Sequence, residues 1–146
     1  MDPAEFINCG LRLVAGSTEA DWRSAVSRMY YGAFHSACDL LAGCGVELPR
    51  HQAHAKLTQC LSQAANQSLV EASRKLSSLR EARRIADYEL RDPKPQNPQW
   101  ARAQIYHTQA VMAAILDCSS AADFDKSAAS IRQYARDTLR LTVREP

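Results

Sequence analysis

The sequence predicts an all-α protein, an antiparallel bundle of four long helices plus one or two shorter helices. A segment of more than twenty residues, Glu19–Leu41, contains no proline and places apolar side chains at helical spacing along one side. Segments before and after it carry the same spacing, and the connections between them are short. Because short connections favour antiparallel neighbours, a bundle is the economical architecture.

The helix predicted over residues 19–41 is the one around which the other helices are expected to pack. Thr18 and Asp21 imitate a capping box at its beginning, and the glycines at 43 and 45 are expected to end it. Its expected buried stripe consists of Trp22, Val26, Met29, Ala33, Ala37 and Leu40. The small residues that would let a neighbouring helix approach closely are Ala25, Gly32, Ala33, Ser36 and Ala37.

Five more helices are predicted from the same spacing and from residues that start or stop helices. They cover about residues 3–15, 52–65, 68–90, 99–118 and 123–143. Three prolines between residues 92 and 98 predict an extended surface turn, because proline cannot continue a helix. The expected buried positions include Leu90 in the fourth helix and, in the fifth, Trp100, Ala103, Tyr106 or His107, Ala110, Ala114 and Leu116.

Length and composition predict one domain over residues 1–146 that folds without a cofactor. A chain of this length buries about two-thirds of its unfolded surface. Five cysteines, an odd number with no C-x-x-C pair, favour buried thiols in a reducing compartment over disulfides. The acidic first residues and the lack of a long apolar run exclude a signal peptide and a membrane-spanning helix. We therefore expect a soluble, cytoplasmic protein with no membrane contact.

The charge balance points towards anions without deciding the question. A net charge of +2 is too small to predict non-specific nucleic-acid binding by itself. The cations, however, are fourteen arginines against four lysines. The planar fork of arginine suits phosphates and carboxylates, so this balance favours anion recognition, although a high genomic GC content produces the same bias.

The first candidate anion site is a polar face of the helix predicted over residues 19–41. Arg28, Tyr31, His35 and Asp39 follow one another at positions i, i+3, i+7 and i+11 and therefore lie on one side. In the functional interpretation, Arg28, Tyr31 and His35 form the floor of a groove for an anionic ligand. In the alternative, the same face is simply solvated.

The second candidate is a face of the helix predicted over residues 68–90. Arg80, Arg84, Asp87 and Arg91 lie at i, i+4, i+7 and i+11. Two guanidinium groups at i and i+4 repel each other unless a negative group lies between them, and Asp87 neutralises only part of this cluster. A phosphate would complete it. The alternative is a salt-bridged face in which Arg83 or Arg84 pairs with Asp87.

The sequence predicts no metal site and no cofactor. His51 and His54 have a spacing that allows metal ligation, but no Asp, Glu or Cys stands nearby to complete a site. The chain also lacks a glycine-rich phosphate loop, a G-x-S-x-G elbow and an H-E-x-x-H motif. These absences leave phosphate-loop NTPases, hydrolases of that type and zinc proteases without support.

Two segments are similar to the motif helices of a known superfamily. Arg28, Tyr30, Tyr31, Ala33 and Phe34 resemble the first long core helix of the HEPN superfamily, the nucleotide- and RNA-associated helical domains of prokaryotes. The segment 79–90, LREARRIADYEL, resembles the "R…ADY" version of the helix that carries the HEPN functional motif, at the distance along the chain that the superfamily uses. The resemblance covers residues 22–90 and implies a helical module that binds nucleotide or RNA phosphate.

The functional motif departs from the superfamily's pattern at one position. Active members carry an arginine followed after four to six residues by a histidine, and if Arg80 is that arginine, Asp87 stands where the histidine is expected. Attack of an RNA 2′-hydroxyl needs a base that titrates near neutral pH, as histidine does and aspartate does not. We therefore expect a catalytically degenerate module. The candidate catalytic residues are Arg80, Asp87 and Tyr88, and the candidate phosphate contacts are Arg28, Tyr31, His35 and Arg84.

The resemblance also implies partners. Small HEPN proteins commonly pair with a minimal nucleotidyltransferase in toxin–antitoxin or defence modules, and many form homodimers with one composite groove. In related toxins the partner modifies a tyrosine that Tyr88 resembles. Two alternatives stay open: a divergent metal-independent HEPN ribonuclease toxin that uses Arg80, Asp87 and Tyr88, and a structural protein–protein interaction module whose arginine faces are solvated.

Overall fold

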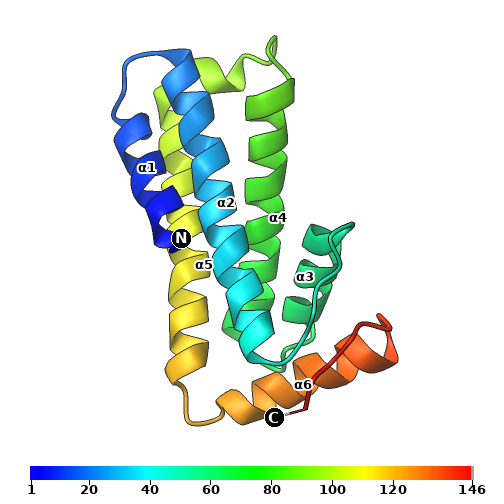
Figure 1. Ribbon diagram of the computed structural model, residues 1–146. Helices are drawn as coiled ribbons and strands as arrows, with labels where there is room; N and C mark the ends of the chain where they lie inside the picture. The colour runs from blue at the N-terminus through cyan, green and yellow to red at the C-terminus, as the bar shows by residue number, and fades with distance from the viewer. Residues whose placement is uncertain (146) are drawn as a thin grey trace. The chain divides into compact units, whose positions relative to one another are not determined.

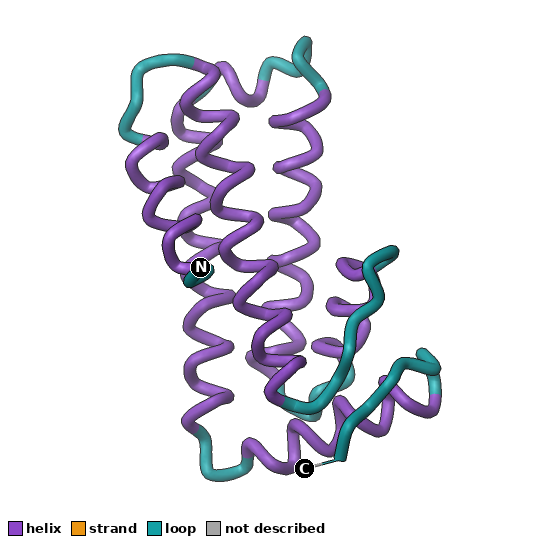
Figure 2. Tube along the Cα trace, in the orientation of Figure 1, coloured by secondary structure: helices purple, strands orange, loops and turns teal. Residues whose placement is uncertain are grey.

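The computed structural model describes residues 1–145, and its regular structure is helical (Figure 1). The helices are α1 (Ala4–Val14), α2 (Glu19–Gly43), α3 (Ala53–Ser62), α4 (Gln67–Tyr88), η1 (Lys94–Gln96, a 3-10 helix), α5 (Pro98–Ser120) and α6 (Phe124–Asp137). Figure 2 shows helices and loops, and no strand, over this described range. The predicted all-α class is confirmed.

The chain divides into two compact units, each built from two separate stretches of sequence. Unit 1 comprises Met1–His35 and Lys75–Ala110, and unit 2 comprises Ser36–Arg74 and the residues that follow position 110. The helices α2, α4 and α5 each contribute residues to both units. Within residues 1–145, no helix is long and apolar enough to cross a membrane. The assignment of residues 1–146 to a single domain stays a prediction.

In unit 1, α1 lies against the first part of α2 (Figure 1), and small residues make this contact close. A Cβ atom added to Gly32 would lie 2.4 Å from the side chain of Ile7, and one added to Gly10 would lie 2.9 Å from the side chain of Met29. The small residues of α2 therefore do allow a neighbour to approach, as predicted. The neighbour at Gly32 is α1 of the same chain.

The capping box predicted at the start of α2 is confirmed. Thr18 Oγ1 accepts a hydrogen bond from the Asp21 N–H at 3.1 Å, and Asp21 Oδ2 accepts one from the Thr18 N–H at 3.1 Å. Trp22 Nε1 donates to the Gly16 carbonyl at 2.9 Å and fixes the turn before the helix. The buried core of unit 1 includes Val14, Ala25, Val26, Met29, Ala82, Ala86 and Ala101.

In unit 2, α3 packs against α6, and the segment after α6 pairs with the loop after α2. Val46 and Val143 form an isolated antiparallel bridge, and the Arg144 N–H donates to the Gly45 carbonyl at 2.8 Å. All five cysteines are free thiols, and Cys44, Cys60 and Cys118 are buried as the composition predicted. Burial raises the pKa of Cys44 and of Cys60 to about 11, so both thiols are protonated at neutral pH.

Two details of the predicted elements are wrong. The sixth helix was expected to reach residue 143, but α6 ends at Asp137. The Leu141 N–H donates to the Ala135 carbonyl at 2.9 Å, and Arg140 adopts a left-handed φ of 55°, which turns the chain. The proline segment is not simply extended, because it contains η1 and buries Pro95.

The predicted buried side of the fifth helix is right at Ala114, which is buried, and wrong at three other positions. Tyr106 and Leu116 are 75% and 69% exposed, and Ala103 is exposed too. Gln104 and Thr108 are buried instead, because their side chains donate to carbonyls of their own helix. Leu90 was expected to be buried at the end of the fourth helix, but it lies beyond the end of α4 and is 72% exposed.

Candidate functional site

The candidate site lies in unit 1, where the end of α4 is held by Arg23 of α2. The last carbonyl groups of a helix have no partner within the helix and need outside donors. The Arg23 guanidinium is buried and donates to the carbonyls of Ala86 at 2.9 Å and Ile85 at 3.2 Å. It also reaches the carbonyls of Glu89, Leu90 and Asp92 at 3.3 to 3.4 Å.

A carboxylate completes the surroundings of this buried cation. Glu19, one turn earlier on α2, accepts from Arg23 Nε at 2.8 Å. A charge taken out of water is tolerated where an opposite charge and hydrogen-bond acceptors surround it. Arg23 therefore fixes where residues 85–92 lie relative to the first part of α2. Sequence reasoning missed this residue, although a Glu–Arg pair at i, i+4 beside the apolar stripe was a signal for it.

Near Arg23, the Arg83 side chain of α4 lies on the side that faces α2 and pairs with Asp87, one turn later on α4. Arg83 Nε donates to Asp87 Oδ2 at 3.1 Å, and the Ser27 hydroxyl of α2 donates to the same oxygen at 3.2 Å. Arg83 also donates to the Tyr88 hydroxyl at 3.1 Å. Of the two pairings that the sequence left open for Asp87, the structure has the one with Arg83.

Arg83 keeps its positive charge in this partly covered position. Burial by itself lowers the pKa of Arg83, but the hydrogen bond to Tyr88 and the neighbouring Tyr31 and Asp87 together raise it above its ordinary value. Two of its five N–H bonds go to Asp87 and Tyr88. Within residues 1–145, its other N–H donors have no further hydrogen-bond partner.

Aromatic rings and guanidinium groups alternate across α1, α2 and α4. The Arg28 guanidinium lies 5.4 Å from the ring centre of Phe6 and 5.8 Å from that of Tyr31. The Arg83 guanidinium lies 5.3 Å from the ring centre of Tyr31 and 5.4 Å from that of Tyr88. We call Phe6, Arg28, Tyr31, Arg83 and Tyr88 the arginine–aromatic row.

His35 of α2 lies beside the row, next to Phe6 of α1. Its ring stacks on Phe6 with ring centres 5.8 Å apart and an interplanar angle of 16°, and it lies 6.2 Å from Tyr31. His35 is exposed, whereas Arg28 and Tyr31 are half-buried. The face predicted from Arg28, Tyr31 and His35 thus comes together around Phe6 of α1, which was not among the predicted site residues.

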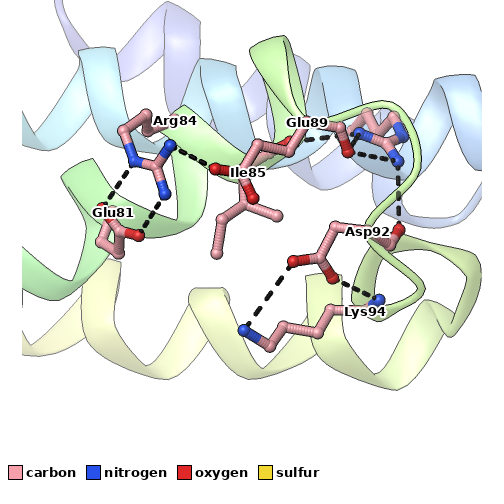
Figure 3. A network of polar contacts seen from close by, with 7 residues as sticks. Glu81, Arg84, Ile85, Glu89, Asp92 and Lys94 are labelled. Atoms are coloured by element: carbon pink, nitrogen blue, oxygen red, sulfur yellow. Dashed lines mark hydrogen bonds and ion pairs between the residues drawn. The ribbon is translucent and has the colours of Figure 1, made fainter.

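Arg84, on the outer face of α4, is neutralised differently from the prediction. Arg84 Nη2 donates to Glu81 at 2.7 Å, and Arg84 Nη1 pairs with Glu89 (Figure 3). These hydrogen bonds raise the pKa of Arg84, and the bond from Arg84 lowers the pKa of Glu81. At Arg84, the negative charge that we expected from a phosphate is therefore supplied by Glu81 and Glu89.

The structure brings some predicted site residues together and separates others. Tyr31, Asp87 and Tyr88 meet at Arg83, and Arg28 and His35 meet at Phe6. Arg80 is exposed and takes no part in a hydrogen bond or ion pair within residues 1–145, and Arg84 faces Glu81 and Glu89. Their assigned roles stay predictions. Arg83, which the sequence analysis named only as one of two possible partners of Asp87, holds the central position.

Comparison of this chain with protein-family models, with curated proteins and with solved structures finds no match. The case for a function therefore depends on the geometry of the residues themselves.

Proposed function

We propose that unit 1 binds RNA or a nucleotide through its phosphates at the arginine–aromatic row, as an HEPN-like module without strong nuclease activity of its own. In keeping with the sequence resemblance, such a module would act in a prokaryotic toxin–antitoxin or defence system beside a partner such as a nucleotidyltransferase. The observation that carries the binding proposal is the position of two guanidinium groups over aromatic rings, with 5.3 to 5.8 Å between each guanidinium carbon and the ring centres.

The two guanidinium carbons lie over the rings at 5.3 to 5.8 Å from the ring centres, which is a cation–π arrangement. The N–H donors of a guanidinium group suit the oxygens of a phosphate. Arg28 has no ion pair with any described carboxylate, so its charge is not cancelled by the protein. Sequence-tolerant binding of single-stranded nucleic acid commonly combines such cations with aromatic rings on which bases stack.

The surroundings of Asp87 support the part of the proposal that concerns nuclease activity. A general base needs a lone pair directed at the hydroxyl proton that it removes. One oxygen of Asp87 already accepts from Ser27 and from Arg83. This arrangement favours a role in holding Arg83 over a role as the base.

The experiment is a binding series with a fluorescent RNA oligonucleotide at several salt concentrations. Each arginine that contacts a phosphate contributes to the salt dependence, so Arg28→Ala and Arg83→Ala should each lower the slope of log K against log salt by about one. Arg102→Ala is the matched control, because Arg102 is an exposed arginine of α5 in the same unit. It should leave the slope unchanged. No binding to RNA or nucleotides at low salt would contradict the proposal and favour the structural interaction module.

A further inference from the structure

The arginine–aromatic row ends in an exposed ring. Tyr88, the last residue of α4, is 69% exposed, and the Arg83 guanidinium lies 5.4 Å from its ring centre. Its hydroxyl accepts from Arg83, which further limits the movement of the ring. The row therefore offers solvent an aromatic surface that is already positioned.

An open hollow adjoins this ring. It is lined by Tyr88, Glu89, Leu90, Arg91 and Asp92 and has a volume of about 520 Å³, which lies in the range of small-molecule sites. We call it the Tyr88 hollow. Leu90 adds a second exposed apolar side chain to it. The backbone that forms the hollow is fixed by Arg23, which holds the carbonyls of Glu89, Leu90 and Asp92.

Cations and carboxylates alternate around the hollow. Arg91 is exposed and contributes a positive charge to its lining. The carboxylate of Glu89 pairs with Arg84, and that of Asp92 lies 3.9 Å from the Lys94 ammonium group (Figure 3). Both carboxylates keep further lone pairs that can accept hydrogen bonds, because an ionised carboxylate accepts about four. The lining of the hollow thus combines two exposed side chains with apolar surface, Tyr88 and Leu90, with carboxylate acceptors and a cation.

We propose that the Tyr88 hollow binds an unpaired, amino-bearing purine base of an RNA strand. This inference rests on the proposed function, because the phosphates of the same strand would lie on the arginines of the row. A purine stacks over a larger area than a pyrimidine, and the amino group of adenine or guanine can donate to Glu89 or Asp92. Uracil carries no amino group. A base inside a duplex does not expose its face for stacking, so single strands are selected.

The test uses a single-stranded adenine dodecamer that contains one 2-aminopurine and carries an end label. Label anisotropy reports total binding, and 2-aminopurine fluorescence reports stacking on an aromatic ring. We expect wild-type protein to quench 2-aminopurine and to bind the adenine strand more tightly than a uracil strand or the adenine–uracil duplex. Stacking of one base on an aromatic side chain is worth about tenfold in affinity, so Tyr88→Leu should lose about that factor together with the quenching.

Two further variants separate the ring from its surroundings. Tyr88→Phe keeps the ring and should keep the quenching and the preference for adenine. Tyr106→Leu is the matched control, because Tyr106 is the other strongly exposed tyrosine described in unit 1, 75% exposed on α5 and outside the row. It should behave as wild type.

The outcomes distinguish this inference from the proposed function. If Tyr88→Leu binds the adenine strand with wild-type affinity and quenching, or if all strands bind equally well, the hollow is not a base site, while salt-dependent RNA binding at the arginines still stands. If wild-type protein binds no RNA at low salt, both the proposed function and this inference are wrong.

Discussion

Arg83 and Asp87 form an ion pair one helical turn apart on α4, with 3.1 Å between Arg83 Nε and Asp87 Oδ2, on the side that faces α2. The pair gives Arg83 a fixed orientation, in which its guanidinium lies over the rings of Tyr30, Tyr31 and Tyr88. Both members are more than half covered, so the pair is less screened by solvent than an ordinary surface salt bridge.

Replacement of Arg83 by lysine should lower the free energy of unfolding. Lysine keeps the charge but loses the flat group that stacks on the rings and the fork that reaches both Asp87 and Tyr88. We expect a loss of about 1 kcal/mol in urea unfolding. Arg80→Lys is the control, because Arg80 is exposed on the same helix. Equal effects of the two substitutions would contradict a special contribution of stacking.

Removal of Arg23 should be more damaging. Arg23→Ala would leave the carbonyls at the end of α4 without their donor and Glu19 without its cation. Leaving buried polar groups unpaired in this way costs about 3 kcal/mol. The same substitution at Arg12, an exposed residue of α1, should change stability by less than about 0.5 kcal/mol. Urea unfolding measures both, and a small effect of Arg23→Ala would mean that water replaces the guanidinium at the end of α4.

The pairing of Asp87 within the arginine–aromatic row could not be predicted from the sequence of α4 alone. The spacing of Arg80, Arg84 and Asp87 along α4 predicted a shared face, and the spacing of Arg83 and Asp87 predicted a pair equally well. The choice between them depends on Ser27 and the tyrosines of α2, which a reading of α4 alone does not include. The position of Arg23 was missed for the same reason, because its acceptors lie more than sixty residues away in sequence.

The helices themselves were predictable because their signals are local. The capping box of Thr18 and Asp21 and the apolar stripe of α2 needed only neighbouring residues. Hydropathy did not predict which side of α5 is buried. Gln104 and Thr108 are polar but can be buried, because their side chains donate hydrogen bonds to carbonyls one turn earlier in the same helix.

Stability should fall in acid through two identified carboxylates. Hydrogen bonds with Thr18 hold the pKa of Asp21 below its ordinary value of 3.8, and the hydrogen bond from Arg84 holds that of Glu81 below 4.5. The unfolded chain therefore takes up these protons at a higher pH than the folded chain does. The stabilisation is complete at pH values above the ordinary pKa of each carboxyl group in the unfolded chain. It is lost as the pH falls through the lowered pKa of the same group in the folded chain.

Unfolding temperatures measured between pH 6 and pH 2.5 check this direction. Asp21→Asn and Glu81→Gln should each lower the unfolding temperature at pH 6, and each difference from wild type should shrink towards pH 2.5. A difference that stays constant over this range would mean that the charge of the carboxylate is not what stabilises the fold.

A homodimer remains our expectation for the protein in solution. A two-fold axis would place two arginine-bearing α4 helices around one composite anion site. The small residues of α2 do not supply the contact at Gly32, because α1 of the same chain covers that position. Sedimentation velocity over a series of protein concentrations measures the state. A strict monomer throughout would restrict the anion site to a single chain.

The purified protein should cleave single-stranded RNA weakly or not at all, because Asp87 stands where a histidine is expected and its Oδ2 already accepts from Ser27 and Arg83. Asp87→His should raise cleavage, since it supplies a base that titrates near neutral pH and releases Arg83 to stabilise the pentavalent phosphate. The assay follows a labelled RNA with wild type, Asp87→His, Asp87→Ala and Arg80→Ala. Asp87→Ala separates the two effects, because it also frees Arg83 but provides no base. Strong wild-type cleavage that both alanine substitutions abolish would establish the divergent ribonuclease instead, with Arg80 and Asp87 in its active site. Tyr88 would then be the position at which modification by a partner controls cleavage.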